Sequence, residues 1–344
     1  MKHLAAISEQ ELAGCLKRYG EPLFRTKQIN SWIFEKWVSS IEEMKNLPAH
    51  LRKKLSEDFR YADSEVINTE TSGDTTEKIL ISLADGECIE NVIIRTPERT
   101  TFCLSSQVGC PVQCHFCASG KDGLIRNLEA GEIIDHLLIC CRRAGKRPDN
   151  IVFMGIGEPL INFSNITTAL ETISSPSCFA LSPRRITVST SGWVPGIRQL
   201  AKLAKPYNLA LSLHGTNDST RARLIPDKYR YPLAEILDAC LDYREKTGRM
   251  ITFEYTLIKK VNDSLTAAAE LANLAKKYHA KVNVIPFNHV DGSGFECPDT
   301  KDTADFFKIL SDRKVQATCR IKKGDTISAA CGQLRAGRRN RQND

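Results

Sequence analysis

The pattern of apolar and polar positions divides this chain near residue 100. In the first sixty residues, apolar side chains recur at the three- and four-residue spacing of amphipathic helices. The helices predicted in this way cover residues 9–19, 26–39 and 49–59. Two apolar runs follow, 78–83 and 89–95, on either side of Asp85-Gly86, a dipeptide typical of tight hairpin turns. The first hundred residues therefore predict a helical segment and then a β-hairpin.

Beyond residue 100, short apolar strands alternate with amphipathic helices. The predicted strands are 101–105, 150–154, 186–190, 209–213, 251–258 and 282–287, with a last strand at 315–321. The predicted helices are 132–142, 165–173, 194–204, 233–246, 265–278 and 303–311. Parallel strands need crossover helices, so six such repeats without a dinucleotide-binding fingerprint predict an α/β fold, a partial (β/α)6 barrel. Barrels of this kind hold their sites at the C-terminal ends of the strands.

The same patterns predict four segments: a helical accessory domain over 1–60, a β-hairpin linker over 61–98, a barrel core over 99–334 and a basic, mobile tail over 335–344. With 344 residues, 42% of them hydrophobic, the chain can bury a core of this size. It has no run of about 18 apolar residues, and its N-terminus does not resemble a signal peptide, so we expect a cytoplasmic protein without a membrane span. The formal charge of +7 leans towards a polyanionic partner, although many enzymes are this basic.

Three of the thirteen cysteines lie close together after the first barrel strand. Cys110, Cys114 and Cys117 have C-x3-C-x2-C spacing, and soft thiolates select zinc, copper(I) or iron–sulfur clusters. A closed zinc site needs a fourth ligand, and His115 would have to fold back between two cysteines to supply it. A 4Fe–4S cluster held by three cysteines keeps one iron open to a small molecule. The spacing favours the cluster, and a zinc-stapled RNA-binding protein is the alternative.

Glycines and small polar residues follow several other predicted strands. The second strand leads into Met154-Gly155-Ile156-Gly157-Glu158-Pro159, the third into Ser189-Thr190-Ser191-Gly192, the fourth into Ser212-Leu213-His214 and the sixth into Asn288. Glycines let a backbone approach a ligand closely, and Glu158 can hold an ammonium or ribose group. Taken singly, these motifs are explained equally well by a tight turn or a packed histidine. Their repetition at successive strand ends predicts a polar cofactor across the barrel mouth.

Two cysteines and one glutamate outside these motifs also carry reactive groups. Cys103 lies in the first barrel strand, Cys331 lies in a glycine-containing loop near the C-terminus, and Glu90 lies in the second hairpin strand. From the residues alone, the two cysteines are explained equally well as small buried apolar side chains. Glu90 is explained equally well as a solvent-facing strand residue.

Ordered motifs give the chain a specific resemblance. The segment SSQVGCPVQCHFCASG, residues 105–120, resembles the cluster loop of the radical S-adenosylmethionine RNA-adenine methyltransferases, the RlmN/Cfr family. Further family segments are matched by GIGEPLIN, STSG, SLHGTND, AACGQL and the pair Pro286 and Asn288. The resemblance runs from about residue 24 to residue 334. It implies a radical-SAM barrel that methylates RNA.

The resemblance also implies a role for each matching residue. Cys110, Cys114 and Cys117 would bind a 4Fe–4S cluster. The residues expected to line the S-adenosylmethionine site are Gly157, Glu158, Ser189, Ser212, Leu213, His214 and Asn288. Cys331 matches a cysteine that becomes S-methylated, Cys103 matches a thiol that later forms a transient disulfide with it, and Glu90 matches a proton acceptor.

The chemistry implied by the resemblance needs two extra cysteines. Carbon 2 of adenine is electrophilic and has no lone pair, so it cannot attack a methylsulfonium directly. Cys331, a soft nucleophile, would accept the methyl group first. A 5′-deoxyadenosyl radical from a second S-adenosylmethionine would take hydrogen from that methyl group, and the carbon radical would add to adenine. Proton loss and attack by Cys103 on the Cys331 sulfur would release the product.

The implied substrate is an adenine in RNA. Glu158 is followed by Pro159, as in carbon-2 enzymes, whereas the antibiotic-resistance branch usually has alanine there. We therefore expect methylation of carbon 2 of an adenine in 23S rRNA, at the peptidyl-transferase centre, and of the anticodon-adjacent adenine of tRNA. Carbon-8 methylation is the alternative. The other implied partner is an electron donor such as flavodoxin or ferredoxin, and we expect a monomer.

Basic residues lie beside aromatic and apolar ones in the N-terminal helices. They are Arg25, Lys27, Arg52, Lys53 and Lys54. A solvated helix face explains them, and so does a small RNA-binding module.

Overall fold

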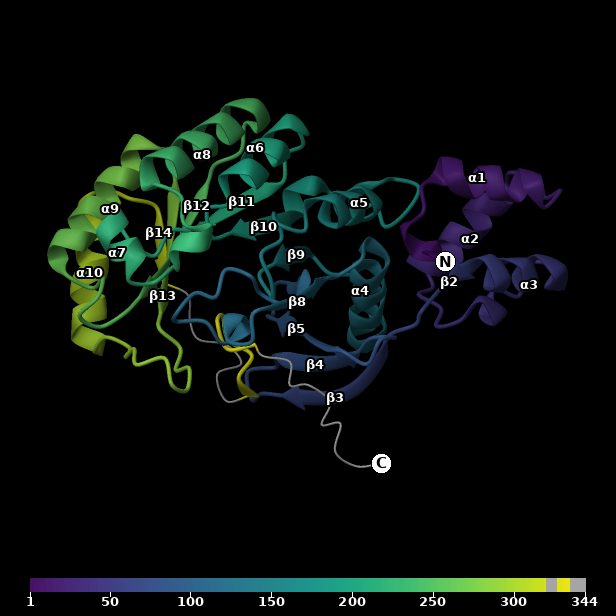
Figure 1. The fold of residues 1–344 in the computed structure, drawn as a ribbon, viewed down its shortest axis with the longest axis horizontal. Helices are drawn as coiled ribbons and strands as arrows, with labels where there is room; N and C mark the ends of the chain where they lie inside the picture. The colour runs from purple at the N-terminus through teal and green to yellow at the C-terminus, as the bar shows by residue number, and fades with distance from the viewer. Residues whose placement is uncertain (320–326, 335–344) are drawn as a thin grey trace.

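Ten strands form one continuous sheet in the computed structural model, which describes residues 1–319 and 327–334 (Figure 1). Seven of these strands run parallel, in the order β14-β13-β12-β11-β10-β9-β6. Their bounds are β6 Thr100–Cys103, β9 Asn150–Phe153, β10 Ile186–Thr190, β11 Asn208–Ser212, β12 Thr252–Leu257, β13 Lys281–Pro286 and β14 Ala317–Cys319. The predicted last strand, 315–321, and the predicted tail, 335–344, extend outside the described residues.

Helices connect the parallel strands and cover the outer face of the sheet (Figure 1). They are α4 Ala130–Ala144, α5 Phe163–Ser174, α6 Val194–Lys202, α7 Asp218–Ala222, α8 Leu233–Thr247, α9 Leu265–Lys277 and α10 Thr300–Asp312. The predicted α/β architecture, a partial (β/α)6 barrel, is confirmed. None of the helices in the described ranges is long and apolar enough to cross a membrane.

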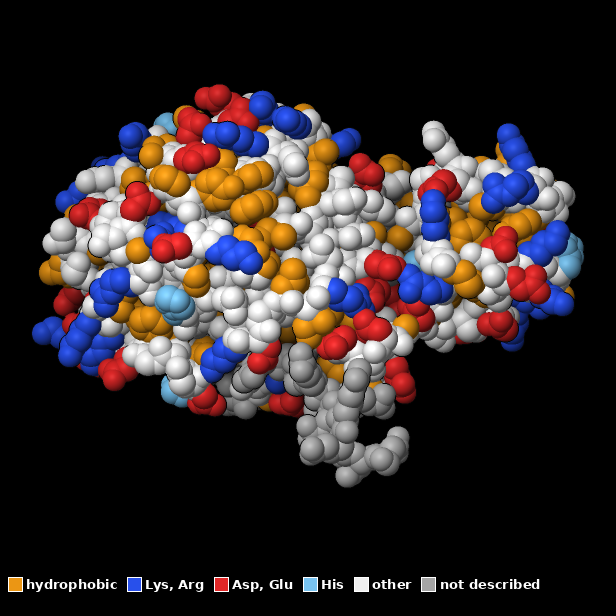
Figure 2. Space-filling view, viewed as in Figure 1, with side chains coloured by type: hydrophobic (Ala, Val, Ile, Leu, Met, Phe, Trp, Pro, Cys, Tyr) orange, Lys and Arg blue, Asp and Glu red, His pale blue; other side chains and the backbone are white. Residues whose placement is uncertain are grey.

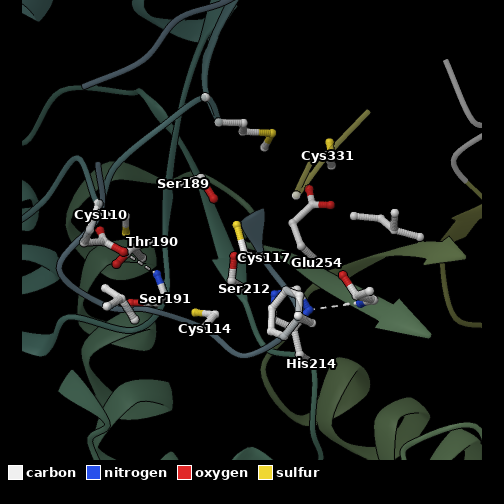
Figure 3. A pocket seen from close by; sticks show the side chains of 18 of the residues that line it. Cys110, Cys114, Cys117, Ser189, Thr190, Ser191, Ser212, His214, Glu254 and Cys331 are labelled. Atoms are coloured by element: carbon white, nitrogen blue, oxygen red, sulfur yellow. Dashed lines mark hydrogen bonds between the residues drawn. The ribbon is translucent and has the colours of Figure 1, made fainter. Parts of the chain in front are cut away.

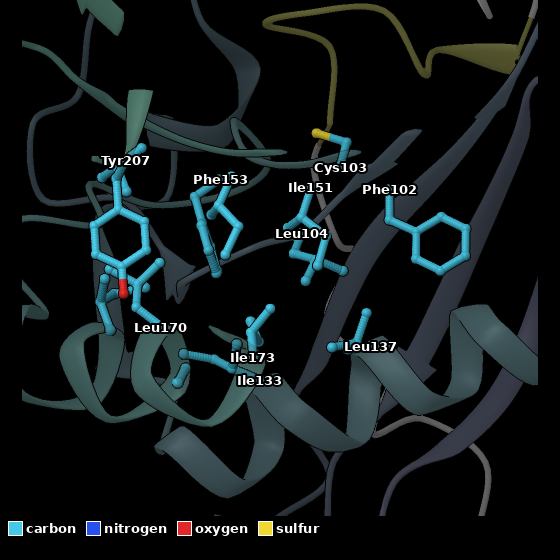
Figure 4. Packing of buried hydrophobic residues seen from close by; sticks show 14 of the residues in the cluster. Phe102, Cys103, Leu104, Ile133, Leu137, Ile151, Phe153, Leu170, Ile173 and Tyr207 are labelled. Carbon is cyan, nitrogen blue, oxygen red and sulfur yellow. The ribbon is translucent and has the colours of Figure 1, made fainter. Parts of the chain in front are cut away.

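The core lies between the sheet and these helices (Figure 4). Phe102 and Leu104, in and just after β6, pack with Ile133 and Leu137 of α4, and all four side chains are buried. Burying one such side chain contributes about 1.5–3 kcal/mol. Because side chains alternate across a strand, Cys103 points away from this core, to the opposite face of β6 (Figure 4).

Three antiparallel strands extend the sheet beyond β6. β5 (Cys88–Arg95) pairs with β6 and with β4 (Glu77–Ser82), and the turn at Asp85-Gly86 joins the two hairpin strands. The predicted hairpin is therefore present. A third strand, β3 (Glu65–Thr71), pairs with β4. Its residues are mostly exposed or half-buried, so it lacks the apolar pattern that would have predicted it.

Three helices precede the sheet and form a separate lobe (Figure 1). They are α1 Glu9–Arg18, α2 Arg25–Phe34 and α3 Ala49–Asp58, and the short strands β1 (Lys2–His3) and β2 (Phe59–Arg60) pair with each other. The prediction that α2 continues to residue 39 is wrong. Trp37 adopts a φ of +53°, and the backbone N–H of Val38 donates to the carbonyl oxygen of Trp32, which closes the helix end.

Candidate active site

The three motif cysteines lie on a loop between β7 (Gln107–Gly109) and β8 (Leu124–Asn127), which pair with each other. Gly109 adopts a φ of +75°, and a Cβ there would lie 2.0 Å from the carbonyl oxygen of Gly123. A Cβ on Gly120 would lie 2.6 Å from the Cα of Gln113. Only glycine fits at these two contacts, so close backbone packing shapes the loop.

The sulfur atoms of these cysteines are spread more widely than one zinc ion requires. Zinc bound tetrahedrally at 2.3 Å from each thiolate holds the sulfurs about 3.8 Å apart. Among the described residues, the one trio of possible metal ligands whose ligand atoms all lie within 4.8 Å of one another is elsewhere, and it excludes these cysteines. His115 is turned away, with its Nδ1 3.1 Å from the carbonyl oxygen of Arg223. The wider spread fits a larger group such as a 4Fe–4S cluster.

The electrostatics of the loop favour a cationic guest. Burial raises the pKa of the Cys114 thiol well above its ordinary value, and the neighbouring Cys117 and Cys110 raise it further. Burial likewise raises the pKa of Cys110 to about 12. Because metal ligands must be thiolates, a metal centre that replaces the protons would relieve this cost. The donor set and its surroundings therefore fit an iron–sulfur cluster.

Glu158, which follows β9, is buried and joins two strand ends. Its Oε2 accepts a hydrogen bond from the N–H of Ser191 at 2.7 Å, and its Oε1 accepts one from the N–H of Leu160 at 3.2 Å. Its own N–H donates to Oε1 of Gln107 at 2.7 Å. Burial raises the pKa of Glu158, and the hydrogen bonds to its carboxylate oppose that rise. The carboxylate therefore holds β9 to β10 in addition to facing the mouth.

His214 links β11, β12 and the cysteine loop. Its Nδ1 accepts a hydrogen bond from the N–H of Thr256 at 3.0 Å, and Asn262 Nδ2 donates to the carbonyl oxygens of both residues at 2.7 Å. Phe116 packs edge-on against the ring, with centroids 4.7 Å apart. Burial lowers the pKa of His214 to about 3, so the ring is neutral at pH 7. These contacts fix its orientation at the mouth.

Arg221 is a buried cation that the sequence analysis missed. This side chain of α7 is fully buried, and its guanidinium donates to the carbonyl oxygens of Ser191, Ser212 and Leu213. Burial lowers its pKa to about 10, which leaves it charged at pH 7. Arg221 therefore ties the end of β10 to the end of β11. One arginine in a polar run carries no signal of this role.

Cys331 lies at the mouth, although it comes from the C-terminal part of the sequence. Asn288, just beyond β13, donates from Nδ2 to the carbonyl oxygen of Cys331 at 3.0 Å. Two further hydrogen bonds, both 2.7 Å long, dock residues 331–334 on the cysteine loop. Ala118 N–H donates to the Gly332 carbonyl oxygen, and Ser119 Oγ donates to the Leu334 carbonyl oxygen. Cys331 lies close enough to Cys117 to contribute to the raised pKa of Cys117, whose largest cause is burial.

These elements enclose a hollow at the barrel mouth (Figure 3). It has about 920 Å³ of empty space, including the side open to solvent. The predicted residues that line it are Cys110, Cys114, Cys117, Gly157, Glu158, Ser189, Ser212, His214, Asn288 and Cys331. Oδ1 of Asn288 is buried there without a hydrogen-bond partner among the described residues. A polar ligand such as S-adenosylmethionine, beside a cluster, would satisfy it.

Three predicted site residues lie outside this lining. Leu213 is a buried residue at the end of β11, while Cys103 lies in β6 and Glu90 in β5. Glu90 is only 6% exposed, so the solvent-facing alternative is wrong, and Nζ of Lys78 lies 3.4 Å from its carboxylate. All thirteen cysteines lie among the described residues and are present as thiols. The transient disulfide between Cys103 and Cys331 is therefore not seen.

The rest of the lining falls into two groups. Residues that belong to motifs already identified in the sequence are Val112, Phe116, Met154, Gly155, Pro159, Thr190, Ser191 and Gly332. Residues outside those motifs, which were not predicted, are Phe153, Glu254, Thr256, Ile285 and Phe287. Glu254 of β12 is buried, and its Oε2 accepts a hydrogen bond from Nδ2 of Asn283 at 2.7 Å. An acidic residue inside an apolar strand, as in ITFEYTLI, is a signal that could have identified it.

The basic residues of the N-terminal helices have mixed surroundings. Arg25 and Arg52 donate to backbone carbonyl oxygens within the same lobe, at 3.1 and 2.5 Å. Lys27 and Lys53 are exposed, and Lys54 lies over the ring of Tyr19. On the face seen in Figure 2, basic side chains of this lobe are interspersed with acidic ones. RNA binding by these residues stays a prediction.

Comparisons with known proteins agree with this site. Residues 104–272 match the radical SAM superfamily, and residues 2–60 match the ribosomal RNA large subunit methyltransferase N-terminal domain. A probable dual-specificity RNA methyltransferase RlmN from Akkermansia muciniphila is 42% identical, over 96% of this chain and 95% of its own. The protein of the same name from Clostridium perfringens is 44% identical, over 97% of each chain.

A solved structure extends the comparison to the fold. The crystal structure of a radical SAM methyltransferase from Sphaerobacter thermophilus is 40% identical, with a TM-score of 0.94 over 98% of this chain and 100% of that one. With nearly full-length identity above 40% to several relatives, this chain belongs to the RlmN family of radical S-adenosylmethionine RNA methyltransferases.

Proposed function

We propose that this enzyme methylates carbon 2 of adenine in RNA through a methyl group carried on Cys331. The observation that carries the proposal is that Cys331 lines the same hollow as Cys110, Cys114 and Cys117, although it lies more than 200 residues later in the sequence. A thiol with only a packing role has no need to face an open hollow beside three other cysteines. Its position there is what a carrier sulfur requires.

In this proposal, Cys110, Cys114 and Cys117 hold a 4Fe–4S cluster, and the strand ends hold S-adenosylmethionine. The bound cluster supplies the electron that cleaves S-adenosylmethionine reductively. The Asn288 Oδ1 without a partner and the small polar side chains Ser189 and Ser212 supply hydrogen bonds to that ligand. The apolar side chains that line the hollow limit the access of water to reactive species.

Asn288 and the docked segment 331–334 position the carrier sulfur. The hydrogen bond from Asn288 Nδ2 fixes the backbone of Cys331 beside the end of β13. The thiol of Cys331 is the first methyl acceptor, because a thiolate attacks a methylsulfonium readily. The methyl group is then held where hydrogen can be removed from it and where an adenine can reach it.

Glu90 and Cys103 complete the proposed cycle after carbon–carbon bond formation. Glu90 accepts the proton from carbon 2, and Lys78, 3.4 Å away, stabilises it as a carboxylate. Cys103 then attacks the Cys331 sulfur as a thiolate, which breaks the bond from sulfur to the methylene carbon and leaves a disulfide. The released carbon takes up a proton and becomes the methyl group, and the one electron left over after radical addition would return to the bound cluster.

The proposed substrates are an adenine of 23S rRNA and the anticodon-adjacent adenine of tRNA. The name of the relatives, dual-specificity RNA methyltransferase, supports two RNA classes, and Pro159 after Glu158 supports carbon 2 over carbon 8. The predictions of a flavodoxin or ferredoxin donor, a monomer and a cytoplasmic location accompany this proposal. So do the domain limits of 1–60, 61–98 and 99–334.

The test compares Cys331→Ala with Cys103→Ala, expressed with RNA present. Cys331→Ala lacks the carrier sulfur, so it should give neither methylated protein nor a covalent RNA complex. Cys103→Ala should form the adduct and stall, so it should purify with RNA attached through a bond that survives denaturation. Nuclease digestion and peptide mass spectrometry should then locate a methylene-bridged adenosine on Cys331, and the linkage position on the base should distinguish carbon 2 from carbon 8.

Cys140→Ala is the matched control, because Cys140 is a fully buried cysteine of α4 outside the mouth. It should lose about 1 kcal/mol of stability and keep its activity. Two results would contradict the proposal. One is a Cys103→Ala protein that holds only unlinked, methylated Cys331. The other is behaviour of all three variants like that of Cys140→Ala.

A further inference from the structure

A second cluster of possible metal ligands lies far from the barrel mouth, where the N-terminal lobe meets the barrel (Figure 1). His3, Asp63 and Asp135 each place one ligand atom within 4.8 Å of the other two. We call these three residues the junction cluster. They come from β1, from the segment after β2 and from α4, so each belongs to a different part of the chain.

Two of the three side chains in the junction cluster are buried, and each has a polar atom that faces the cluster. The side chains of His3 and Asp135 are 2% and 1% exposed. Within residues 1–319 and 327–334, Nε2 of His3 and Oδ1 of Asp135 have no hydrogen-bond partner, and Nε2 lies 3.7 Å from Oδ1 of Asp63. Unpaired buried polar atoms are costly, so two of them directed at the Asp63 carboxylate favour a bound cation.

Two arginines border the cluster without filling it. Arg60 lies 3.7 Å from Asp63, and Arg142 lies 3.9 Å from Asp135, both beyond hydrogen-bonding distance. Arg60 also pairs with Glu129. Three carboxylates therefore face two guanidinium groups, which leaves a net negative charge. Oδ2 of Asp135 accepts a hydrogen bond of 3.1 Å from the N–H of Ser64. This bond orients the carboxylate so that Oδ1 faces His3 and Asp63.

We propose that the junction cluster binds a divalent transition-metal cation of the zinc type, through Nε2 of His3 and one carboxylate oxygen each from Asp63 and Asp135. One imidazole and two carboxylates are an ordinary ligand set for Zn²⁺, with water in the fourth position. Tetrahedral bonds of about 2.0–2.2 Å place ligand atoms roughly 3.3–3.5 Å apart, so shifts of about 1 Å or less complete the site. The ion would cross-link the N-terminal lobe to α4.

Binding has one requirement in the His3 ring. Nδ1 now accepts a long hydrogen bond of 3.3 Å from the N–H of Ala5, which leaves the ring proton on Nε2. A cation on Nε2 moves that proton to Nδ1 and gives up this bond. The change of tautomer is a signature that a purely structural role of His3 would not produce.

The experiment uses the cluster-containing enzyme, kept anaerobic and dialysed against a chelator that leaves its iron in place. Zinc chloride is then added in equilibrium dialysis, and bound zinc and iron are measured together. The wild type should take up one equivalent of zinc that His3→Gln and Asp135→Asn bind more than tenfold less tightly. Zinc should also raise the melting temperature of the wild type but not of the two variants.

Asp149→Asn is the matched control. Its carboxylate accepts a hydrogen bond of 2.7 Å from the N–H of Thr100, as that of Asp135 does from the N–H of Ser64. Asp149 belongs to no trio of possible metal ligands among the described residues. This variant should bind zinc as the wild type does. In ¹⁵N-labelled wild type, zinc should convert His3 from the Nε2–H to the Nδ1–H tautomer, which tests the proposal without any substitution.

Two results would overturn this proposal. In one, the wild type binds no more zinc than His3→Gln, which includes the case of zinc taken up at Cys110–Cys117 with loss of iron. In the other, the His3 tautomer is unchanged at saturating zinc. Both tests are independent of RNA methylation, so they stand whether or not Cys331 carries a methyl group.

Discussion

At the barrel mouth, Glu158 and Arg221 are held by several backbone groups each, whereas His3 and Asp135 of the junction cluster each accept one backbone amide and direct their other polar atom towards side chains. Glu158 accepts two backbone amides, and Arg221 donates to three backbone carbonyls. At the junction, the pairs from His3 to Asp63 and from Arg142 to Asp135 are 3.7 and 3.9 Å apart, and only one carboxylate oxygen of Asp135 receives a backbone amide.

This difference indicates where the molecule is rigid. Backbone groups at strand ends are already fixed by the sheet, so polar side chains bonded to them lose little extra freedom and keep one geometry. Ion pairs between side chains depend on two mobile partners and on solvent conditions. We therefore expect the mouth to keep its shape when a side chain that makes none of these backbone hydrogen bonds is replaced. We expect the stability of the junction to change with pH, salt and cations.

The largest effect should come from the cysteine loop. Cys114→Ala should reduce cluster iron to background and abolish RNA methylation, because three thiolates are needed, while the fold is kept by the glycine contacts around the loop. Iron analysis, circular dichroism and a methylation assay measure this. Cys178→Ala, a half-buried cysteine outside the mouth, should keep its iron. Full iron and activity in Cys114→Ala would show that the ligand assignment is wrong.

A second prediction compares one arginine from each region. Arg221→Met should lower the free energy of unfolding by about 3 kcal/mol or more, because three buried carbonyl oxygens lose their donor. Arg60→Met should lower it by less than about 1 kcal/mol, because its side chain is 33% exposed and its pairs are screened. Urea unfolding measures both changes. Equal losses of unfolding free energy in the two variants would show that a charge bonded to backbone groups is no more important for stability than a charge paired with side chains.

A third prediction concerns acid. Burial lowers the pKa of His3 to about 4 and that of His136 and His214 to about 3, so below pH 6.5 the unfolded chain binds protons that the folded chain does not. Burial raises the pKa of Asp135 to about 6, which offsets one of these three protons. Near pH 5, stability should fall by about 2–3 kcal/mol per pH unit as pH decreases.

His136→Phe should roughly halve that slope, because one of two net protons is removed. His279→Asn, at an exposed position with a φ of +49° that asparagine tolerates, should leave it unchanged. Unfolding curves at a series of pH values measure the slope. An unchanged slope in His136→Phe would mean that His136 does not take up a proton on unfolding.

The smallest effect should come from salt. Raising sodium chloride from about 0.05 to 0.5 M should weaken the junction ion pairs by less than about 1 kcal/mol in total. Trypsin should then cleave faster after Arg60, while cleavage after Arg223 beside the cysteine loop should keep its rate. Peptide mapping over time separates the two sites. Equal acceleration at both would show that salt loosens the whole molecule.

The sequence predicted the barrel well because its strands are apolar runs between polar strand ends. For Ile186–Thr190 the predicted and observed bounds are the same. It did not predict β3, whose exposed residues give no apolar alternation, or the early end of α2, which depends on the left-handed backbone of Trp37. Periodicity reports burial, and these two features depend on edge pairing and local backbone conformation instead.

For the candidate site, the predictive value of the sequence differed from residue to residue. The position of Glu158 after a strand was enough to place it at the mouth, but its bonds to two backbone amides could not be read from neighbours in sequence. Arg221 gave no signal, because its partners are carbonyl oxygens, which every residue has. Spacing alone left Cys331 unexplained, and only the family resemblance gave it a role.

The hydrogen bond from Ser119 to the Leu334 carbonyl oxygen joins residues 215 positions apart. During synthesis at roughly 5–20 residues per second, Leu334 is added about 10–45 s after Ser119. Throughout that interval the three cysteines lack the segment that later docks beside them. Iron and sulfide can therefore reach them before the chain is complete, and a chain that stops before residue 327 should acquire its cluster at least as fast as the full-length protein.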